Sequence, residues 1–216
     1  MGAGTQASCV WHDDAASCDL SRSEGAGKGF VLRPGLSRIE TPRLRLRGGL
    51  PEDVDAWARM NADPRVMEHF VATTPIERSH AQARLMHDDL ERDGYGWFIL
   101  ELRNQLGFAG VIAIAGISWD APFEPRREVG WRLPVERWGN GYATEGASAA
   151  LRYAFDTLRW PEVVAMTATG NNRSQRVMQR LGMTRDPAED FGHPRVPEGH
   201  RICRHVLYRL RATDMP

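Results

Sequence analysis

The chain has 216 residues, enough for one folded domain and an extension. Its 42% hydrophobic and 26% charged residues are typical of a globular protein, and 28 Lys and Arg balance 28 Asp and Glu, so net charge gives no reason to expect a nucleic-acid partner. No apolar run approaches the ~20 residues of a membrane span, and the three cysteines cannot all pair, so we expect a reduced, cytoplasmic protein without a membrane partner.

The first 37 residues differ in composition from the rest of the chain. They are rich in Gly, Ala and Ser and show neither helical nor strand periodicity. We therefore expect a flexible N-terminal extension at 1–37 and one folded domain at 38–216.

Two patterns in this extension resemble binding motifs but lack the required residues. "GAGKG" would be a phosphate-binding loop only with Gly in place of Arg22 and Ser or Thr in place of Gly29. Cys9, His12 and Cys18 do not have the spacing of a zinc site. We expect no metal.

The folded part begins with a strand and two helices. Alternation in "RLRLR" predicts a strand at 43–47, and a short helix follows at 51–60 with Val54 and Trp57 facing inward.

The second helix carries terminal signals at both ends. We expect Thr74 to be its N-cap, with Pro75 at the first helical position and Glu77 completing a capping box. Gly94 closes its C-terminus.

The next segments predict strands. "YGWFILEL" and "GFAGVIAIAGI" are joined by a short connection, which indicates an antiparallel hairpin, and "EVGWRL" follows after a loop. A helix then begins after two glycines, and its apolar positions recur at helical spacing: Ala143, Ala147, Ala150, Leu151, Ala154 and Leu158.

The C-terminal third predicts a strand, a helix and a last strand. "VVAMTAT" is strand-like, "NNRSQRVMQRLGM" is helical with Asn172 and Gln175 at capping-box spacing and Gly182 at its end, and "HVLYRL" is the last strand. The order of elements indicates an α+β fold rather than a doubly wound one.

The stretch "RWGNGYATE" places Gly139 and Gly141 between a strand and a helix. Backbone N–H groups at a helix start have no internal partners, and glycine lets an anion approach them, so this turn is a candidate phosphate site. A plain tight turn is the alternative. A dinucleotide-binding fingerprint is disfavoured because it would need Gly or Ala at Thr144.

Two stretches of the sequence, around the glycine turn and in the next strand and helix, are similar to a known family. "EVGWRLPVERWGNGYATEGASAALRYAF" followed by "VVAMTATGNNRSQRVMQRLGM" resembles the GNAT superfamily of N-acetyltransferases, in particular the Rim-type branch of ribosomal-protein N-terminal acetyltransferases. The superfamily loop pattern, Gln/Arg-x-x-Gly-x-Gly/Ala, is matched from Glu136 to Gly141 except at Glu136 itself. The resemblance runs from about Ile39 to the C-terminus.

The resemblance implies a fold and a donor. The fold would be a mixed, mostly antiparallel sheet flanked by helices, with a splayed strand pair holding an acyl-CoA, most often acetyl-CoA. The residues implied in donor binding are Val129, Trp131, Leu133, Arg137, Trp138, Gly139, Asn140, Gly141, Tyr142, Ala143, Asn171 and Ser174. Arg173 and Arg176 are further candidates for phosphate contacts, or plain surface charges.

The chemistry requires a base for the attacking amine and a donor for the departing thiolate. Strand alternation places Glu128 with Gly130 and Arg132 on one face, and Glu128 is the first candidate base, a structural ion pair being the alternative. Asp186, three residues after "GM", is the second candidate, because Rim-type enzymes often carry a catalytic Glu there.

The group that would donate a proton to the departing thiolate differs from that of many superfamily members. The alignment places Met178 where many superfamily members have a Tyr, and a thioether cannot donate a proton, so Ser174 is the candidate, with helix capping as its alternative role. His193, His200 and His205 are expected to be loop and strand histidines without catalytic duty, and the alternative is that they line the acceptor pocket or bind a metal, for which they lack a recognised ligand spacing.

The expected function is acetyl-CoA-dependent acetyl transfer to a primary amine, either on a small molecule or at a protein N-terminus, by a monomer or homodimer. A non-catalytic acyl-CoA-binding domain on the same fold is the alternative, and Met178 is its support. Three loops are expected to choose the acceptor, at 71–79, 120–126 and 186–200. Trp97, Trp119 and Trp131 would either wall the acceptor pocket or belong to the core.

Overall fold

A computed structural model describes residues 39–216, without the side chains of residues 84–89 and 106. The predicted extension at 1–37 lies outside the described residues, and so do Cys9, His12 and Cys18.

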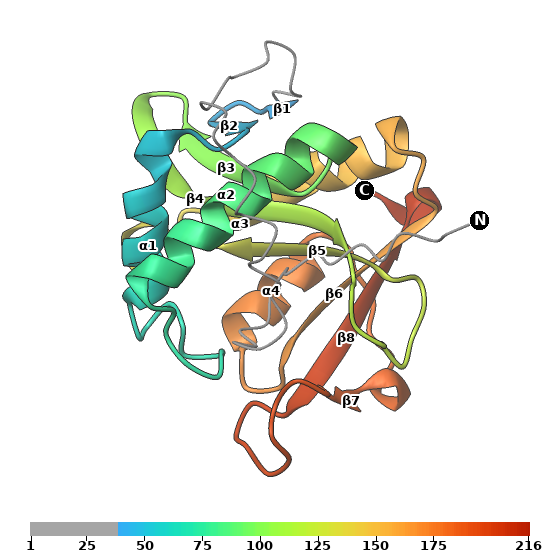
Figure 1. The fold of residues 1–216 in the computed structure, drawn as a ribbon. Coiled ribbons are helices and arrows are strands. Elements are labelled where there is room, and N and C mark those ends of the chain that lie inside the picture. Colours follow the sequence, from blue (N-terminus) through green and yellow to red (C-terminus); the bar gives the residue numbers. More distant parts are fainter. Residues whose placement is uncertain (1–38) are drawn as a thin grey trace, which may run out of the picture.

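An eight-stranded sheet forms the centre of the domain, in the order β1-β2-β3-β4-β5-β6-β8-β7 (Figure 1). The strands are β1 (Ile39–Glu40), β2 (Leu44–Arg47), β3 (Trp97–Leu102), β4 (Gln105–Gly116), β5 (Arg127–Arg132), β6 (Glu162–Ala168), β7 (Phe191–Gly192) and β8 (Arg204–Arg211). Within residues 39–216 the neighbouring strands are antiparallel except β5 and β6, which are parallel. The expected α+β architecture with a mixed, mostly antiparallel sheet is confirmed.

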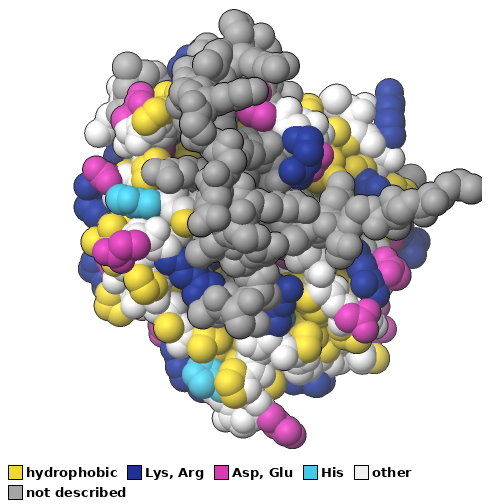
Figure 2. All heavy atoms as spheres, in the orientation of Figure 1, with side chains coloured by type: hydrophobic (Ala, Val, Ile, Leu, Met, Phe, Trp, Pro, Cys, Tyr) yellow, Lys and Arg dark blue, Asp and Glu magenta, His cyan; other side chains and the backbone are white. Residues whose placement is uncertain are grey.

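In the described part of the chain, four α-helices flank this sheet: α1 (Val54–Ala62), α2 (Ile76–Asp93), α3 (Tyr142–Arg152) and α4 (Asn172–Arg180). A π-helical turn, Tyr153–Thr157, extends α3, and short 3-10 turns lie at Pro51–Asp53, Val135–Arg137, Pro187–Glu189 and Ala212–Asp214. No helix in residues 39–216 has the length and apolarity to cross a membrane. Acidic and basic side chains of the described residues intermingle on the face that Figure 2 shows.

Each face of the sheet has its own core. On one face, Trp57 and Met60 of α1 pack with Val111, Ala113 and Ala115 of β4. On the other face the apolar stripe of α3, which the helical spacing predicted, packs with the alternate residues of the strands: Ala147, Ala150, Leu151 and Ala154 against Phe98, Leu100, Ile112 and Ile114. Alternation along the strands therefore separates an α1 face from an α3 face.

Two predicted helix starts are wrong by one residue. Helix α2 begins at Ile76 with Pro75 in the N-cap position, so Thr74 does not cap it and is instead buried. Helix α4 is capped by Asn171 rather than Asn172, and the Asn171 side chain accepts a hydrogen bond from the Ser174 amide. Asn171 has non-helical backbone angles, φ −82° and ψ 71°, and sequence spacing does not reveal this. The predicted closure of α2 by Gly94, at φ 73°, is confirmed.

Candidate active site

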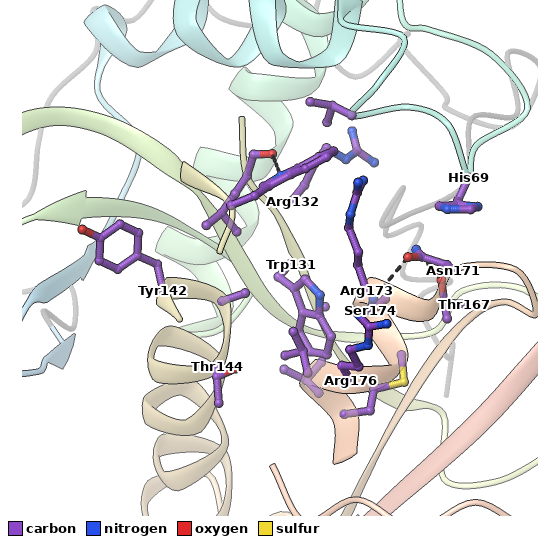
Figure 3. Close-up of a pocket in the computed structure, with 18 of the residues that line it drawn as sticks. His69, Trp131, Arg132, Tyr142, Thr144, Thr167, Asn171, Arg173, Ser174 and Arg176 are labelled. Atoms are coloured by element: carbon purple, nitrogen blue, oxygen red, sulfur yellow. Dashed lines mark hydrogen bonds between the residues drawn. The ribbon is translucent and has the colours of Figure 1, made fainter. Parts of the chain in front are cut away.

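A cavity of about 440 Å³ opens where β5 and β6 part (Figure 3). This is within the range of roughly 300–1,000 Å³ that small-molecule sites have. The two parallel strands share one register pair, Glu128 with Val164, and diverge beyond it (Figure 1). The cavity is lined by β5, the glycine turn, the start of α3, the ends of β6 and β8, α4, and residues 65–70 between α1 and α2.

The glycine turn has backbone that requires glycine. Gly139 and Gly141 have φ of 76° and 78°, in the left-handed region, and Gly141 is the N-cap of α3. A Cβ on Gly139 would meet nothing within 4 Å, so this side of the turn is open. In the first turn of α3, the Thr144 hydroxyl is buried, lines the cavity and finds no hydrogen-bond partner in the described part of the chain. These features suit an oxyanion at the start of α3.

The side chains of Arg43 and Trp138 hold this turn in place. Arg43 donates from Nη1 to the Asn140 carbonyl at 3.0 Å and from Nε to Glu145 at 2.6 Å. The Trp138 indole donates to the Leu133 carbonyl at 2.8 Å. The turn is therefore tied to β2, to α3 and to the end of β5.

The predicted alternation along β5 is confirmed. The register pairs Arg132 with Val111, Gly130 with Ala113 and Glu128 with Ala115, and these three β4 residues belong to the α1 face. Val129 and Trp131 pack with the core of the α3 face.

Glu128 is a carboxyl group buried at the point where the strands part. It is 4% exposed, and burial raises its pKa to about 8, an effect that the charge of Arg195 only partly offsets. A carboxyl with a pKa near neutral pH inside a cavity has the properties of a general acid or base.

Helix α4 presents its first turn to the cavity. The Asn171 side chain accepts from the Ser174 amide at 3.1 Å and donates to the Thr167 hydroxyl at 2.9 Å (Figure 3). Ser174 and, one turn later, the buried Met178 also line the cavity. The Arg173 guanidinium lies 4.5 Å from the centre of the Trp138 ring.

The cavity brings together most of the residues that the sequence pointed to. Its lining includes Glu128, Val129, Trp131, Leu133, Arg137, Trp138, Gly139, Gly141, Tyr142, Ala143, Asn171, Ser174 and Arg176. Asn140 and Asp186, both described residues, lie outside this lining. The Asn140 side chain folds back onto the carbonyls of Arg137 and Trp138, and the Asp186 carboxylate caps the turn Pro187–Glu189 through the Ala188 amide at 2.9 Å.

Several lining residues were missed by the sequence. The loops expected at 71–79, 120–126 and 186–200 contribute no residue to the described lining, whereas Arg65, Glu68, His69 and Phe70 do. Trp97 and Trp119 are buried in the core, away from the lining. Strand alternation, which grouped Arg132 with Glu128, carried a signal for Arg132. The segment 65–70 had no such signal, because its place at the cavity depends on how α1 and α2 pack.

One of the three C-terminal histidines reaches the cavity. His205 lines it, and its ring lies 4.9 Å from that of His193, which is buried in the aromatic cluster of Trp119 and Phe191. Burial lowers the pKa of His205, and burial together with the nearby His205 and Arg195 lowers that of His193 to about 3. Both imidazoles are therefore neutral near pH 7.

Comparisons with known proteins agree with this geometry. Residues 43–184 match the model of the acetyltransferase (GNAT) domain. The chain is 30% identical over 191 residues to the FsC-acetyl coenzyme A-N(2)-transacetylase of Aspergillus fumigatus, covering 82% of this chain and 80% of that protein. It is 34% identical over 172 residues to YnaD, an uncharacterised N-acetyltransferase of Bacillus subtilis, covering 80% of this chain and 95% of that protein.

Solved structures show the same fold. A GNAT-family acetyltransferase from Bacillus anthracis superposes with a TM-score of 0.68 at 22% identity, over 82% of this chain and 99% of that one. An acetyltransferase from Agrobacterium tumefaciens gives 0.65 at 26% identity, over 84% and 98%. The chain therefore belongs to the GNAT family of acetyltransferases and is an N-acetyltransferase by class.

Proposed function

We propose that the protein transfers an acetyl group from acetyl-CoA to a primary amine, and that it lies in the Rim-type branch of the family. "WGNGYATE" and the downstream "N-x-x-S…LGM" are the motifs that support this branch. The relative from A. fumigatus has acetyl coenzyme A and N(2) in its name, which supports the donor and a nitrogen acceptor.

The residues around the cavity fit the donor. Its pyrophosphate would lie on the N–H groups of the turn from Trp138 to Ala143, where the open side of Gly139 and the buried Thr144 hydroxyl suit phosphate oxygens. Arg137 and Arg176, which line the same cavity, would add charge.

The edge of β5 is available for the pantetheine arm. Beyond the register pair of Glu128 and Val164, β5 and β6 no longer pair, so backbone groups between Val129 and Leu133 can bind the amides of the arm as an added strand would. Asn171 and Ser174 border the same opening from α4.

The observation that carries the proposal is the position of Glu128. It lines the same cavity as the glycine turn and lies at the vertex of the splayed strands. We assign to it the role of base: the amine nitrogen bonds to the thioester carbonyl carbon, Glu128 takes the proton that the nitrogen loses, and the carbon–sulfur bond breaks. Because its pKa is about 8, the carboxylate becomes more populated as pH rises through this value.

Ser174 is the group we assign to the departing sulfur. Its hydroxyl is on the first turn of α4 at the cavity, and it can pass a proton to the thiolate as this leaves. Met178, which also lines the cavity, cannot do so. Asp186 has no part in the proposal, because its carboxylate caps a turn away from the described lining.

Calorimetric titration and a turnover assay test the proposal together. Acetyl-CoA and free CoA should each bind at one site per chain, and a panel of primary amines should release CoA thiol in an enzyme-dependent way. Binding without turnover for every amine, or turnover unaffected by Glu128→Gln, would reject the assignment of the base. Absence of binding would reject the donor site at the glycine turn.

A further inference from the structure

We propose that Arg132 binds a carboxylate of the acceptor, and that the substrate is a primary amine with this carboxylate several bonds from the nitrogen. The inference rests on the proposed function and concerns the α1 face of the cavity, opposite the face that carries α3.

Arg132 is a buried guanidinium in the cavity wall. Arg132 is 7% exposed and lines the cavity at the end of β5. It points to the α1 face, as its register partner Val111 shows, whereas the glycine turn leads into α3 on the other face. It is therefore separate from the phosphate contacts proposed at the turn.

Side chains of α1 and of the segment 65–70 contact this guanidinium. Its Nη1 donates to the side-chain oxygen of Asn61, in α1, at 2.6 Å. Its carbon lies 4.2 Å from the ring centre of Phe70 and 5.5 Å from that of Trp57. A guanidinium held in this way is preorganised, and its planar set of N–H donors matches a carboxylate.

Arg132 and Glu128 line the same cavity from one face of β5. The residue between them on the α1 face is Gly130, which also lines the cavity and has no side chain to separate the two. Four residues at about 3.3 Å each place the two Cα atoms roughly 13 Å apart. An acceptor with its nitrogen at Glu128 and an anionic group at Arg132 must therefore be several bonds long.

The neighbouring charge supports this choice of site. Arg65, which lines the cavity from the segment between α1 and α2, is paired with Asp63 at 2.7 Å, and this carboxylate offsets its charge. The charge of Arg65 is therefore less available to a carboxylate of the acceptor than its place in the lining alone suggests.

The test compares ω-amino carboxylates of increasing length with the matching ω-amino amides, on the full chain. We expect the wild type to favour a carboxylate of intermediate length over its amide by at least tenfold in kcat/KM. Arg132→Met should remove this preference through a higher KM for the carboxylate and leave the affinity for acetyl-CoA unchanged. Arg132→Lys should retain part of it, since the charge remains.

Arg127→Met is the matched control. Arg127 begins the same strand, is exposed, and stacks on Trp160 outside the described lining, so its loss should not change the preference. Thermal unfolding of each variant separates loss of binding from loss of fold. A preference that survives in a folded Arg132→Met, or equal rates for carboxylates and amides in the wild type, would overturn the inference and leave acetyl transfer itself intact.

A binding measurement covers the case in which no amine in the series is acetylated. Carboxylates that lack the amine should then still bind to the acetyl-CoA complex of the wild type and not to that of Arg132→Met, as seen by calorimetry. If they bind equally to both, or to neither, the inference fails independently of turnover.

Discussion

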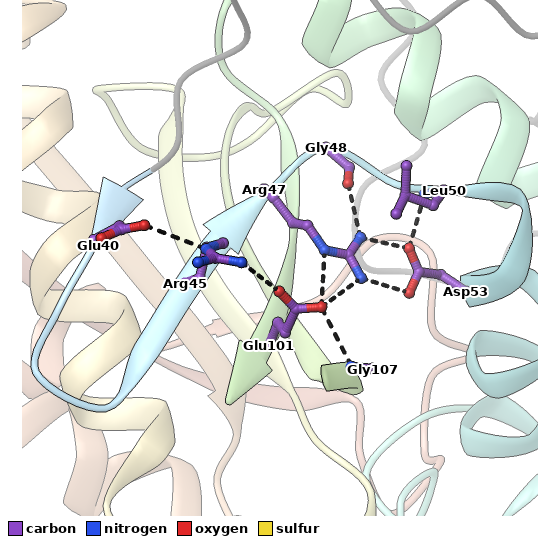
Figure 4. A network of polar contacts seen from close by, with 8 residues as sticks. All are labelled: Glu40, Arg45, Arg47, Gly48, Leu50, Asp53, Glu101 and Gly107. Carbon is purple, nitrogen blue, oxygen red and sulfur yellow. Dashed lines mark hydrogen bonds and ion pairs between the residues drawn. The ribbon is translucent and has the colours of Figure 1, made fainter. Parts of the chain in front are cut away.

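Glu101 and Glu128 are two buried carboxyl groups on strands of the same sheet, and their surroundings give them opposite properties. Glu101, on β3, accepts hydrogen bonds from Arg45, Arg47 and the Gly107 amide (Figure 4). Burial by itself would raise the pKa of Glu101, but these partners outweigh it and lower that pKa. Burial raises the pKa of Glu128 to about 8, against the opposing charge of Arg195.

The difference shows how partners decide the role of a buried acid. Arg47 links Glu101 to Asp53, at 3.3 and 2.6 Å, and so joins β2 and β3 to the start of α1 (Figure 4). This carboxylate stays ionised and holds the fold together. Glu128 instead faces a cavity, where its proton can be exchanged near neutral pH.

The largest expected effect concerns the rate of acetyl transfer. Glu128→Gln removes the base but keeps the shape, so kcat should fall by about 10²–10⁴-fold while the affinity for acetyl-CoA changes little. Steady-state kinetics with the best amine, and calorimetry with acetyl-CoA, measure the two quantities. A loss of less than threefold would mean that Glu128 does not act as the base.

The next effect is a loss of stability when the charge of Glu101 is removed. Glu101→Gln leaves Arg47 and Asp53 without their third partner, and loss of one member of a buried ion-pair network costs about 3–5 kcal/mol in the free energy of unfolding. Glu40→Gln is the control, because Glu40 makes an exposed pair with Arg45 at 3.3 Å and should cost less than about 1 kcal/mol. Urea unfolding measures both, and equal losses would contradict the structural role of Glu101.

The two acids should also act on stability with opposite signs as pH changes. The pKa of Glu101 is lowered, so its contribution is present above the unfolded-state pKa and is lost as pH falls. The pKa of Glu128 is raised from 4.5 to about 8, so the folded state keeps this proton up to a higher pH than the unfolded state does. Its contribution to stability therefore falls as pH rises between these values.

Glu128→Gln removes that second dependence. The free energy of unfolding of this variant, relative to that of the wild type, should rise by on the order of a few kcal/mol between pH about 5 and about 9. Urea unfolding at each pH measures this difference. A stability difference that does not change with pH would show that Glu128 is not held in its protonated form.

The smallest expected effect is seen by comparing two glycines that have nearly the same backbone φ angle. Gly139 and Gly199 have φ of 76° and 78°, and a Cβ on either would meet nothing within 4 Å. Alanine should cost about 1 kcal/mol of stability at each position, but only Gly139→Ala should weaken acetyl-CoA binding, by roughly tenfold, since only Gly139 lines the cavity. Equal affinities for acetyl-CoA in the two variants would remove the turn from the donor site.

The sequence predicted the parts of the site that are local. The glycine turn, the alternation of Glu128 and Arg132 along β5, and the apolar stripe of α3 all depend on neighbours in the chain, and each was found by its spacing. The fold class followed from the order of elements.

Other features depend on tertiary packing and could not be read from spacing. Residues 65–70 reach the cavity because α1 packs on β4, and Asp186 is directed to the Ala188 amide by the turn that follows it. The cap of α4 was assigned to Asn172 because sequence does not show that Asn171 is non-helical. The partners of Glu101 come from β2 and from Gly107 of β4, so its role was not indicated by the sequence.

The most direct test is a carboxyl titration of Glu101 and Glu128 by NMR, with carbon-13-labelled glutamate and the two Gln variants for assignment. We predict that Glu128 titrates near pH 8 and that Glu101 titrates below the usual range of glutamate. If Glu128 titrates in the usual range, the cavity does not hold a carboxyl prepared for proton transfer near neutral pH, and the account of the base is contradicted.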